Sequence, residues 1–310
     1  MKAFVFRKEN KKMELTNKIK NFLHEYRSGC KKSDDHRDSD LPHDIPEVER
    51  IDNLPYGPDE KWHTLDVYLP KKESAPFPVI INIHGGGWVY GTKETYQYYG
   101  MGLAKRGFAF INPNYRLAPE HAEFPDELDD VDRYMHWVDD HAEEYRLDRN
   151  NVFIIGDSAG GQMAEQYVTI LANPDYAKLF SYKPLNLKFR AVGLNCAASF
   201  VLTPDSLAGV ESLYFTKNAV NKYHEQLDVE KYIDHNFLPT FLITANNDFL
   251  HDMQFTLFGF LLGRGVHAIC KSYGDEDNPR GHVFFVNQKD RIADIANDEE
   301  IEFFRQHMSK

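Results

Sequence analysis

Short apolar runs alternate with longer amphipathic stretches along most of this sequence. The runs are rich in Val, Ile, Leu and Phe and are bounded by polar, Gly or Pro residues, which is typical of buried strands. We expect strands at residues 64–69, 78–84, 109–115, 152–156, 191–196, 240–245 and 268–273. Because helical stretches separate these runs, the pattern predicts an α/β fold with a mostly parallel central sheet flanked by helices.

Two stretches show the helical spacing of apolar residues most clearly. One predicted helix carries on a single face Leu128, Val131, Met135, Val138, Ala142 and Tyr145. The other lies near the N-terminus, where the apolar stripe contains Leu15, Ile19, Phe22, Leu23 and Tyr26. We expect a main domain over residues 51–310, a separate N-terminal segment over residues 1–50, and an insertion at about 200–235 that contains Tyr214, Phe215, Tyr223 and Tyr232.

A glycine-flanked serine follows one of the predicted strands. Residues 156–160 read G-D-S-A-G, with Ser158 at the centre and helical spacing after it. This is the G-x-S-x-G nucleophile elbow, in which the serine occupies a sharp, strained turn and the glycines leave room around it. The helix that follows directs its N-terminal N–H groups toward the serine, which favours negative charge there. An ordinary serine in a strand-to-helix turn is the alternative interpretation.

A glycine run follows an earlier predicted strand, where residues 84–88 read H-G-G-G-W. Such a loop supplies backbone N–H donors to an oxyanion that develops during acyl transfer. The alternative is a flexible glycine turn after a strand. A glycine loop and a nucleophile elbow in one chain together favour an acyl-transfer hydrolase.

A nucleophilic serine needs a histidine base and an acid that orients it. In the chain order typical of this elbow, the acid follows a later strand and the histidine comes last. Asp248 follows the predicted strand at 240–245, and His282 lies in the loop after the strand at 268–273, so we assign them these roles. Asp252 is the alternative acid, although its position at a helix N-terminus suits a dipole-stabilising charge.

Residues 84–88, the segment N-Y-R-L-A-P-E at 114–120, and G-D-S-A-G-G at 156–161 together resemble the hormone-sensitive-lipase-like family of α/β-hydrolase carboxylesterases. The resemblance extends over roughly residues 60 to 305. It implies an α/β-hydrolase fold with a helical cap, which residues 1–50 and about 200–235 would build. It also implies a catalytic triad of Ser158, Asp248 and His282. The resemblance further implies an oxyanion hole formed by the N–H groups of Gly86, Gly87 and Ala159.

The resemblance also suggests where substrate binds. Candidate residues of the substrate pocket are Trp88, Tyr90 and Asp157, although core packing is an equally good interpretation of the aromatic residues. The sequence departs from the family after the acid, where Phe249 stands in place of the common proline. It departs again after the histidine, where Val283 stands in place of the common glycine.

The charge and the cysteine content of the chain bear on its binding partners and its cellular location. Residues 1–32 contain ten Lys and Arg against three Glu, a net charge of +7, whereas the whole chain carries −12. Docking of this basic segment on the acidic body is a simpler interpretation than membrane contact, and the acidic total argues against nucleic-acid binding. The three cysteines, widely spaced, favour reduced thiols and a cytoplasmic protein. No metal-ligand spacing is present, the reaction needs no cofactor, and a homo-oligomer is compatible with the architecture.

Three functions are compatible with these motifs. The first is hydrolysis of short- to medium-chain acyl esters, with acetyl and aryl or hydroxycinnamoyl esters as candidates, through an acyl-enzyme intermediate. The second is hydrolysis of small amides, as arylformamidases of the same scaffold perform. The third is ligand binding without catalysis on a hydrolase scaffold, and the presence of His282 argues against it.

Overall fold

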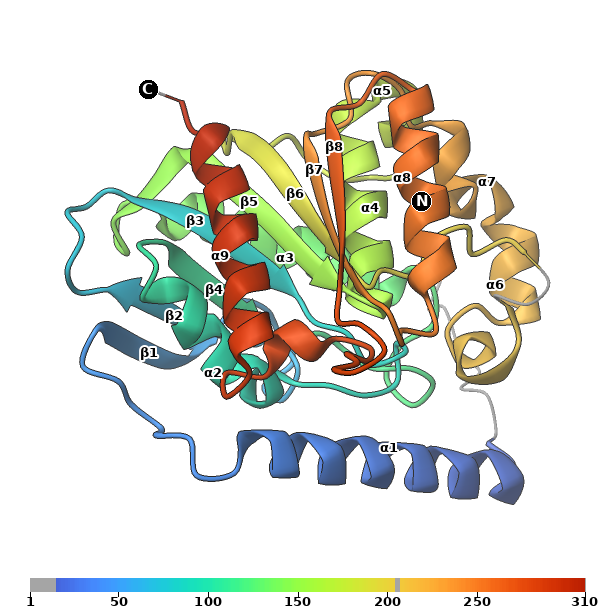
Figure 1. Cartoon of the computed structure of the whole chain (residues 1–310). Helices are drawn as coiled ribbons and strands as arrows, with labels where there is room; N and C mark the ends of the chain where they lie inside the picture. Colours follow the sequence, from blue (N-terminus) through green and yellow to red (C-terminus); the bar gives the residue numbers. More distant parts are fainter. Residues whose placement is uncertain (1–14, 204–206, 310) are drawn as a thin grey trace, which may run out of the picture.

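The computed structural model describes residues 15–203 and 207–309, which form a layered α/β structure (Figure 1). Within these residues, eight strands build one sheet in the order β1-β2-β4-β3-β5-β6-β7-β8. The strands from β4 to β8 in this order are mutually parallel, whereas β2 runs antiparallel to both of its neighbours. Their bounds are β1 Val48–Pro55, β2 Thr64–Pro70, β3 Phe77–Ile83, β4 Ala109–Pro113, β5 Leu147–Asp157, β6 Phe189–Asn195, β7 Thr240–Ala245 and β8 Ala268–Tyr273.

All seven expected strands are present, and the predicted fold class is confirmed. The additional strand is β1, which pairs only with β2 at the edge of the sheet. Polar residues make up half of this strand and interrupt its apolar ones, and all but one of its residues are at least partly exposed, so it lacks the apolar run that marks the other strands. Since β1 begins at Val48, the expected domain boundary at residue 50 falls inside a strand of the sheet.

Helices cover both faces of the sheet. One face carries α2 (Lys93–Ala104) and α9 (Arg291–Gln306), and the other carries α3 (Asp126–His141), α4 (Ala159–Ala172) and α8 (His251–Gly263). Alternate residues of the central strands enter the two resulting cores, as the pleat of a strand requires. Shorter helical turns complete the described chain, namely α5 Pro174–Ala177, η2 Gly209–Leu213, α6 Lys217–Lys222, α7 His224–Leu227, η3 Val229–Lys231 and η4 Phe284–Val286.

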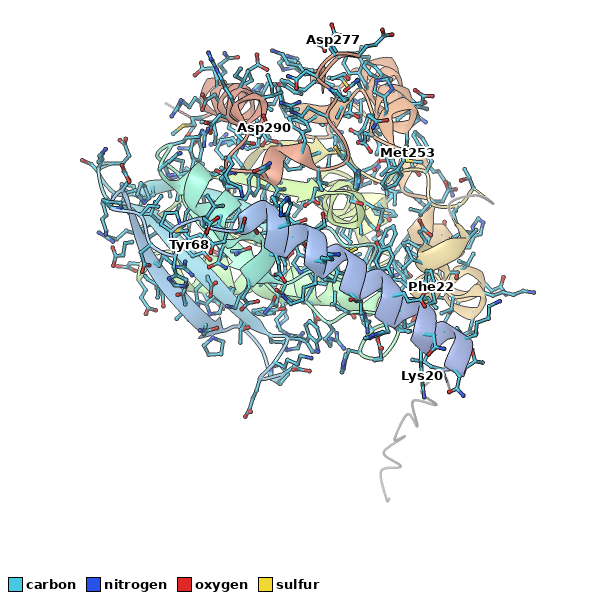
Figure 2. All side chains as sticks on the ribbon, turned by 60° about the horizontal axis from the view of Figure 1, so that its bottom comes forward. Lys20, Phe22, Tyr68, Met253, Asp277 and Asp290 are labelled. Atoms are coloured by element: carbon cyan, nitrogen blue, oxygen red, sulfur yellow. The ribbon has the colours of Figure 1, made fainter. Side chains whose placement is uncertain are left out.

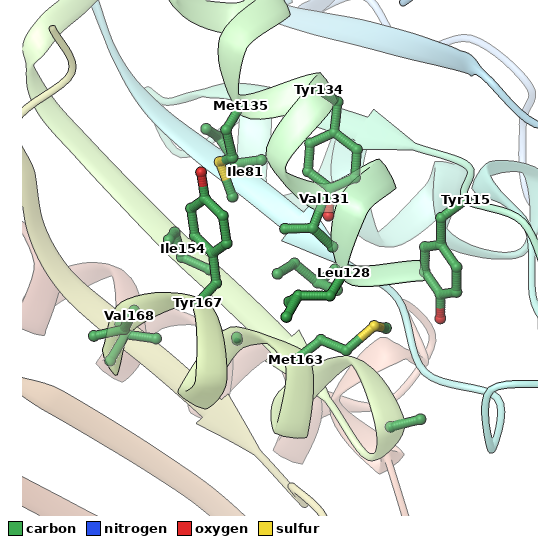
Figure 3. Packing of buried hydrophobic residues seen from close by; sticks show 14 of the residues in the cluster. Ile81, Tyr115, Leu128, Val131, Tyr134, Met135, Ile154, Met163, Tyr167 and Val168 are labelled. Atoms are coloured by element: carbon green, nitrogen blue, oxygen red, sulfur yellow. The ribbon is translucent and has the colours of Figure 1, made fainter. Parts of the chain in front are cut away.

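The apolar face predicted for residues after 125 is the buried face of α3 (Figure 3). Val131 and Met135 of this helix pack above Ile81 and Ile154 of the sheet, beside Tyr167 of α4. Each fully buried side chain of this size stabilises the fold by about 1.5–3 kcal/mol, before the cost of ordering it is counted. This packing fixes the direction in which α4 leaves the sheet.

The N-terminal segment contains α1 (Asn17–Asp38), which crosses the body in Figure 2. Its N-cap Thr16 accepts a hydrogen bond from the backbone of Ile19, as capping predicts. Leu23 is 2% exposed, whereas Phe22 is 43% exposed. The expected stripe is therefore wrong at Phe22, because the contact face follows positions 19, 23 and 26, and Phe22 is rotated about 100° from Leu23.

The insertion between β6 and β7 holds η2, α6, α7 and η3. Its aromatic residues Tyr214 and Phe215 are buried and pack against Phe124. Among the described residues, no helix combines the length and the apolar character needed to cross a lipid bilayer.

Candidate active site

The serine of the G-x-S-x-G sequence lies between the end of β5 and the start of α4. Ser158 has φ +51° and ψ −119°, a conformation that side chains rarely adopt. A methyl group on Gly160 would overlap the carbonyl oxygen of Ile83, and one on Gly156 would overlap the carbonyl oxygen of Gly160. Only glycine fits at these two positions, so the sequence requirement of the elbow follows directly from backbone contact across the turn.

The histidine and the acid meet in the loops after β7 and β8. The Nδ1 atom of His282 lies 2.8 Å from Oδ1 of Asp248, whose carboxyl group is buried. The backbone N–H of Leu250 donates to the same oxygen at 2.9 Å. Burial alone would raise the pKa of Asp248, but these donors, the charge of His282 and the thiol of Cys196 lower it. Asp248 is therefore ionised and keeps Nδ1 of His282 as the hydrogen-bond donor.

The alternative acid, Asp252, occupies the first turn of α8 with its side chain fully exposed. It pairs with its neighbour His251 at 2.9 Å and contributes to the helix N-terminus, as the dipole interpretation expected. The structure thus brings Asp248, and not Asp252, to His282.

Backbone contacts join the two loops that carry the acid and the base. Asn247 and Gly281 form an isolated parallel bridge, and the backbone N–H of Asn247 donates to the carbonyl of Arg280 at 3.0 Å. The residue after the histidine, Val283, has φ +51° and ψ +32°. This left-handed conformation suits glycine, which explains why a glycine is common at this position in the resembling family.

The glycine loop after β3 is held open by its own turn. The N–H groups of Val89 and Tyr90 both donate to the carbonyl of Gly86, at 3.2 and 3.0 Å. Gly86 and Gly87 have φ +129° and +60°, which again favours glycine. Within the described residues, the N–H groups of Gly86, Gly87 and Ala159 have no hydrogen-bond acceptor. Free donors of this kind are what a developing oxyanion requires.

Asp157 connects the elbow to this loop. Its carboxylate accepts hydrogen bonds from the backbone N–H of Gly85 at 3.1 Å and from the hydroxyl of Tyr96 at 2.7 Å. Burial raises the pKa of Asp157 to about 6, although the hydrogen bond from Tyr96 and the charge of His282 oppose the rise. A methyl group on Gly85 would overlap this carboxylate. Asp157 therefore braces the loop from below.

A cavity of about 310 Å³ opens over these groups. Ser158, His282 and the three glycines of the loop line it together with Tyr90 and Asp157. A larger cavity of about 830 Å³ lies between α1 and the body and shares Tyr90 with the first, but it contains neither Ser158 nor His282. The smaller cavity is therefore the one that matches the chemistry.

Comparison with known proteins places this site in context. Residues 65–192 match the BD-FAE family. Carboxylesterase NlhH of Mycobacterium tuberculosis is 27% identical over 193 residues, covering 59% of this chain and 55% of that protein. Arylacetamide deacetylase of Mus musculus is 33% identical over 116 residues, covering 35% of this chain and 29% of that protein. This chain thus matches about half or less of the length of these relatives.

A solved structure matches almost the whole chain. Esterase B from Lactobacillus rhamnosis superimposes with a TM-score of 0.81 at 25% sequence identity, covering 93% of this chain and 95% of that one. The chain has the α/β-hydrolase fold. Its resemblance to the hormone-sensitive-lipase-like esterases, which the three sequence motifs predicted, agrees with these comparisons.

In this α/β-hydrolase, α1 roofs the cavity. Arg27 donates from Nε to the carbonyl of Val89 at 2.8 Å and forms a two-pronged ion pair with Glu120, at 2.9 and 2.7 Å. The hydroxyl of Tyr90 donates to Asp34 of α1 at 2.7 Å. Through Val89 and Tyr90, both contacts attach α1 to the residues that directly follow the three glycines of the loop. The acidic and basic residues of α1 gave no signal of these partners, because each lies more than fifty positions away in the sequence.

Trp88, which we expected to line the substrate pocket, lies outside the cavity. Trp88 is 2% exposed, does not line the cavity beside Ser158, and packs against Phe215 with ring centroids 4.9 Å apart. With φ +62° it continues the left-handed turn of the glycine loop, and its indole joins the core beneath the insertion. Trp88 is therefore a core residue, whereas Tyr90 and Asp157 do line the cavity.

One cluster in the α/β-hydrolase combines three types of metal-ligating group. Single atoms of Cys196, Asp248 and His282 lie within 4.8 Å of one another. Within this cluster, His282 and Asp248 are joined by the 2.8 Å hydrogen bond already described. Sequence reasoning had treated Cys196 only as a reduced thiol, and the structure shows all three cysteines unpaired.

Proposed function

We propose that this α/β-hydrolase is a serine carboxylesterase whose nucleophile, base and acid are Ser158, His282 and Asp248. The observation that carries the proposal is the 2.8 Å contact between His282 Nδ1 and Asp248 Oδ1, at the wall of a cavity that Ser158 also lines. Unpartnered backbone donors of the glycine loop line the same cavity. Nucleophile, oriented base and oxyanion donors are thus in one place.

The catalytic role of His282 follows from the hydrogen bond that one of its two ring nitrogens already makes. Because Nδ1 of His282 donates to Asp248, Nε2 remains to accept the proton of the Ser158 hydroxyl as it attacks the ester carbonyl. The same imidazolium then protonates the departing alcohol, which leaves an acyl group on Ser158. A water molecule, deprotonated by His282, attacks the acyl-enzyme and releases the acid. Asp248 stabilises the imidazolium in both halves of the cycle.

The N–H groups of Gly86, Gly87 and Ala159 would receive the negative charge of the carbonyl oxygen. Removing one such donor typically costs about 3–4 kcal/mol of transition-state stabilisation. Ala159 is the first residue of α4, so the positive end of that helix adds to the same site. Asp157 and its bond to Gly85 would hold the loop at the correct height above the serine.

Short to medium acyl chains are the proposed substrates. Ligand pockets commonly range from about 300 to 1,000 Å³, so the 310 Å³ cavity lies at the small end of that range. A structure of Esterase B with a C4 tributyrin phosphonate inhibitor is among the structural matches and supports a similar size of acyl group here. We propose a cap built from α1 and the insertion between β6 and β7 as the part that sets the acyl preference.

Amide hydrolysis is the second candidate. Arylacetamide deacetylase, by its name an amide hydrolase, is a relative at 33% identity over 116 residues. The same three catalytic groups serve esters and amides, and the difference lies in how well the leaving amine is protonated. Comparing an aryl acetate with the matching N-aryl acetamide on the same protein distinguishes the two activities.

The test is hydrolysis of p-nitrophenyl esters from acetate to decanoate by the wild type and by Ser158→Ala. We expect activity that peaks at short chains and falls by at least about 10³-fold in the variant, since the nucleophile is lost while almost no buried area changes. Circular dichroism confirms that the variant is folded. A folded wild type that hydrolyses none of these esters contradicts the proposal, as does a Ser158→Ala variant with undiminished activity.

A further inference from the structure

Cys196 occupies a special position immediately after β6. It is fully buried and has φ +47°, a left-handed conformation rare for a residue with a side chain. Its backbone N–H donates to the carbonyl of Ile243 in β7 at 2.7 Å. This hydrogen bond holds the backbone of Cys196 against β7 and so limits the directions that its side chain can take.

The turn that contains Cys196 is hydrogen-bonded to the nucleophile elbow. The N–H of Ser158 donates to the carbonyl of Asn195 at 3.1 Å, and the N–H of Ala198 donates to the carbonyl of Ser158 at 3.0 Å. Gly161 packs so closely on Ala197 that a methyl group there would overlap it. Residues 195–198 thus bind the backbone of the serine on one side.

The turn formed by residues 195–198 also lies close to Asp248, the proposed acid. The sulfur of Cys196 lies within 4.8 Å of a carboxylate oxygen of Asp248 and of a ring nitrogen of His282. Burial and then the charge of Asp248 raise the pKa of Cys196 well above its usual value, so the thiol keeps a proton that it can donate. Thr244 offers a second side-chain donor to this carboxylate, but its hydroxyl lies 3.3 Å away, at the long end of hydrogen-bond distances.

We propose that Cys196 is a positioning residue for the acid of the triad. Its thiol donates to Asp248, and its turn carries the elbow of Ser158, so one short segment sets the acid and the nucleophile relative to each other. The inference rests on the proposed function. Without the thiol, the carboxylate of Asp248 would lose a donor in a buried site, turn more freely and become a stronger base toward His282.

The experiment compares Cys196→Ala, Cys196→Ser and Cys270→Ala with the wild type. Cys270 is half-buried on β8, opposite Leu242 of β7 in the sheet, so its replacement controls for loss of a thiol. The rates are measured with p-nitrophenyl acetate across pH, with melting temperatures recorded for each protein. Serine keeps a hydroxyl donor at position 196, whereas alanine keeps none.

We expect kcat of Cys196→Ala at neutral pH to fall about tenfold, the size of a lost hydrogen bond to a charged group. The acid limb of its kcat/KM profile should move to higher pH, because the carboxylate holds the protonated histidine more strongly. Cys196→Ser should recover most of the activity and the wild-type limb, and Cys270→Ala should match the wild type. A loss of stability alone would not move the acid limb.

The proposal is overturned if Cys196→Ala keeps the wild-type kcat and acid limb. It is also overturned if alanine and serine variants lose activity equally while the limb stays in place, because that result indicates a packing role only. An inactive wild type refutes the proposed function and this inference with it. An active wild type whose Cys196→Ala variant is unaffected refutes the inference alone.

Discussion

Replacing Asp157 with asparagine should change how the stability of this α/β-hydrolase depends on pH. The carboxyl group is buried, and its pKa is raised from 3.8 to about 6, first by burial. In the unfolded chain the group titrates near its ordinary value, so between these two pH values the unfolded state releases a proton that the folded state retains. Asp157 therefore stabilises the fold below about pH 4 relative to higher pH, and this contribution is lost as pH rises through about 6.

The size of the effect follows from the shift. A change of about two pKa units corresponds to about 3 kcal/mol, of which about 2 kcal/mol falls between pH 4.5 and pH 7. The Asp157→Asn variant would lack this dependence but keep the geometry. The oxygen of the new amide would accept from the N–H of Gly85, and its nitrogen would donate to the hydroxyl of Tyr96, the two partners that Asp157 has now.

Urea denaturation of both proteins at about pH 4.5 and pH 7 measures the effect, because the midpoints and slopes give the free energy of unfolding. The difference between Asp157→Asn and the wild type should shift by about 2 kcal/mol in favour of the variant as pH rises. Other groups titrate equally in both proteins and cancel. A difference that is the same at the two pH values would refute the assignment of a raised pKa to Asp157.

Two further predictions concern the acid and the elbow. Asp248→Asn should reduce kcat about 10⁴-fold because an amide neither fixes the histidine tautomer nor stabilises the imidazolium by charge, whereas Asp252→Asn, with its exposed side chain, should remain within about twofold of the wild type in the same ester assay. Gly160→Ala should destabilise the protein by at least about 3 kcal/mol in urea, because the new methyl group would overlap a backbone carbonyl that cannot move. Gly259→Ala, an exposed helical position with open space around it, should instead stabilise by about 0.5–1 kcal/mol, and the reverse order would contradict the packing described for the elbow.

The sequence was sufficient for the parts of the site that depend on backbone shape. Glycines at 156 and 160 are required by overlap across a turn, and such a requirement leaves a readable pattern around Ser158. The proposed acid and base could be assigned from the sequence because both follow strands in a fixed chain order, and the structure brings these two residues into contact. In the fold, buried strands were readable from apolar runs, whereas β1 at the half-exposed edge had no such run.

Contacts between segments that are far apart in the sequence could not be predicted from such patterns. Whether Trp88 faced the cavity or the core depended on where the insertion packs, and Phe215 reaches it from more than a hundred positions away. The thiol of Cys196 gave no pattern either, since a single buried cysteine is most often an inert packing residue. Only the coordinates place it against the acid.

The roof over the cavity has a different physical character from the body beneath it. Leu23 is the one fully buried apolar residue in α1, and polar contacts hold much of the helix to the body. Arg27 binds Glu120 and the carbonyl of Val89, and Arg37 donates to the carbonyl of Thr95. The sheet, by contrast, depends on two continuous apolar cores. Under the proposed function, substitutions in the roof would therefore alter which esters enter while leaving the folding of the body intact.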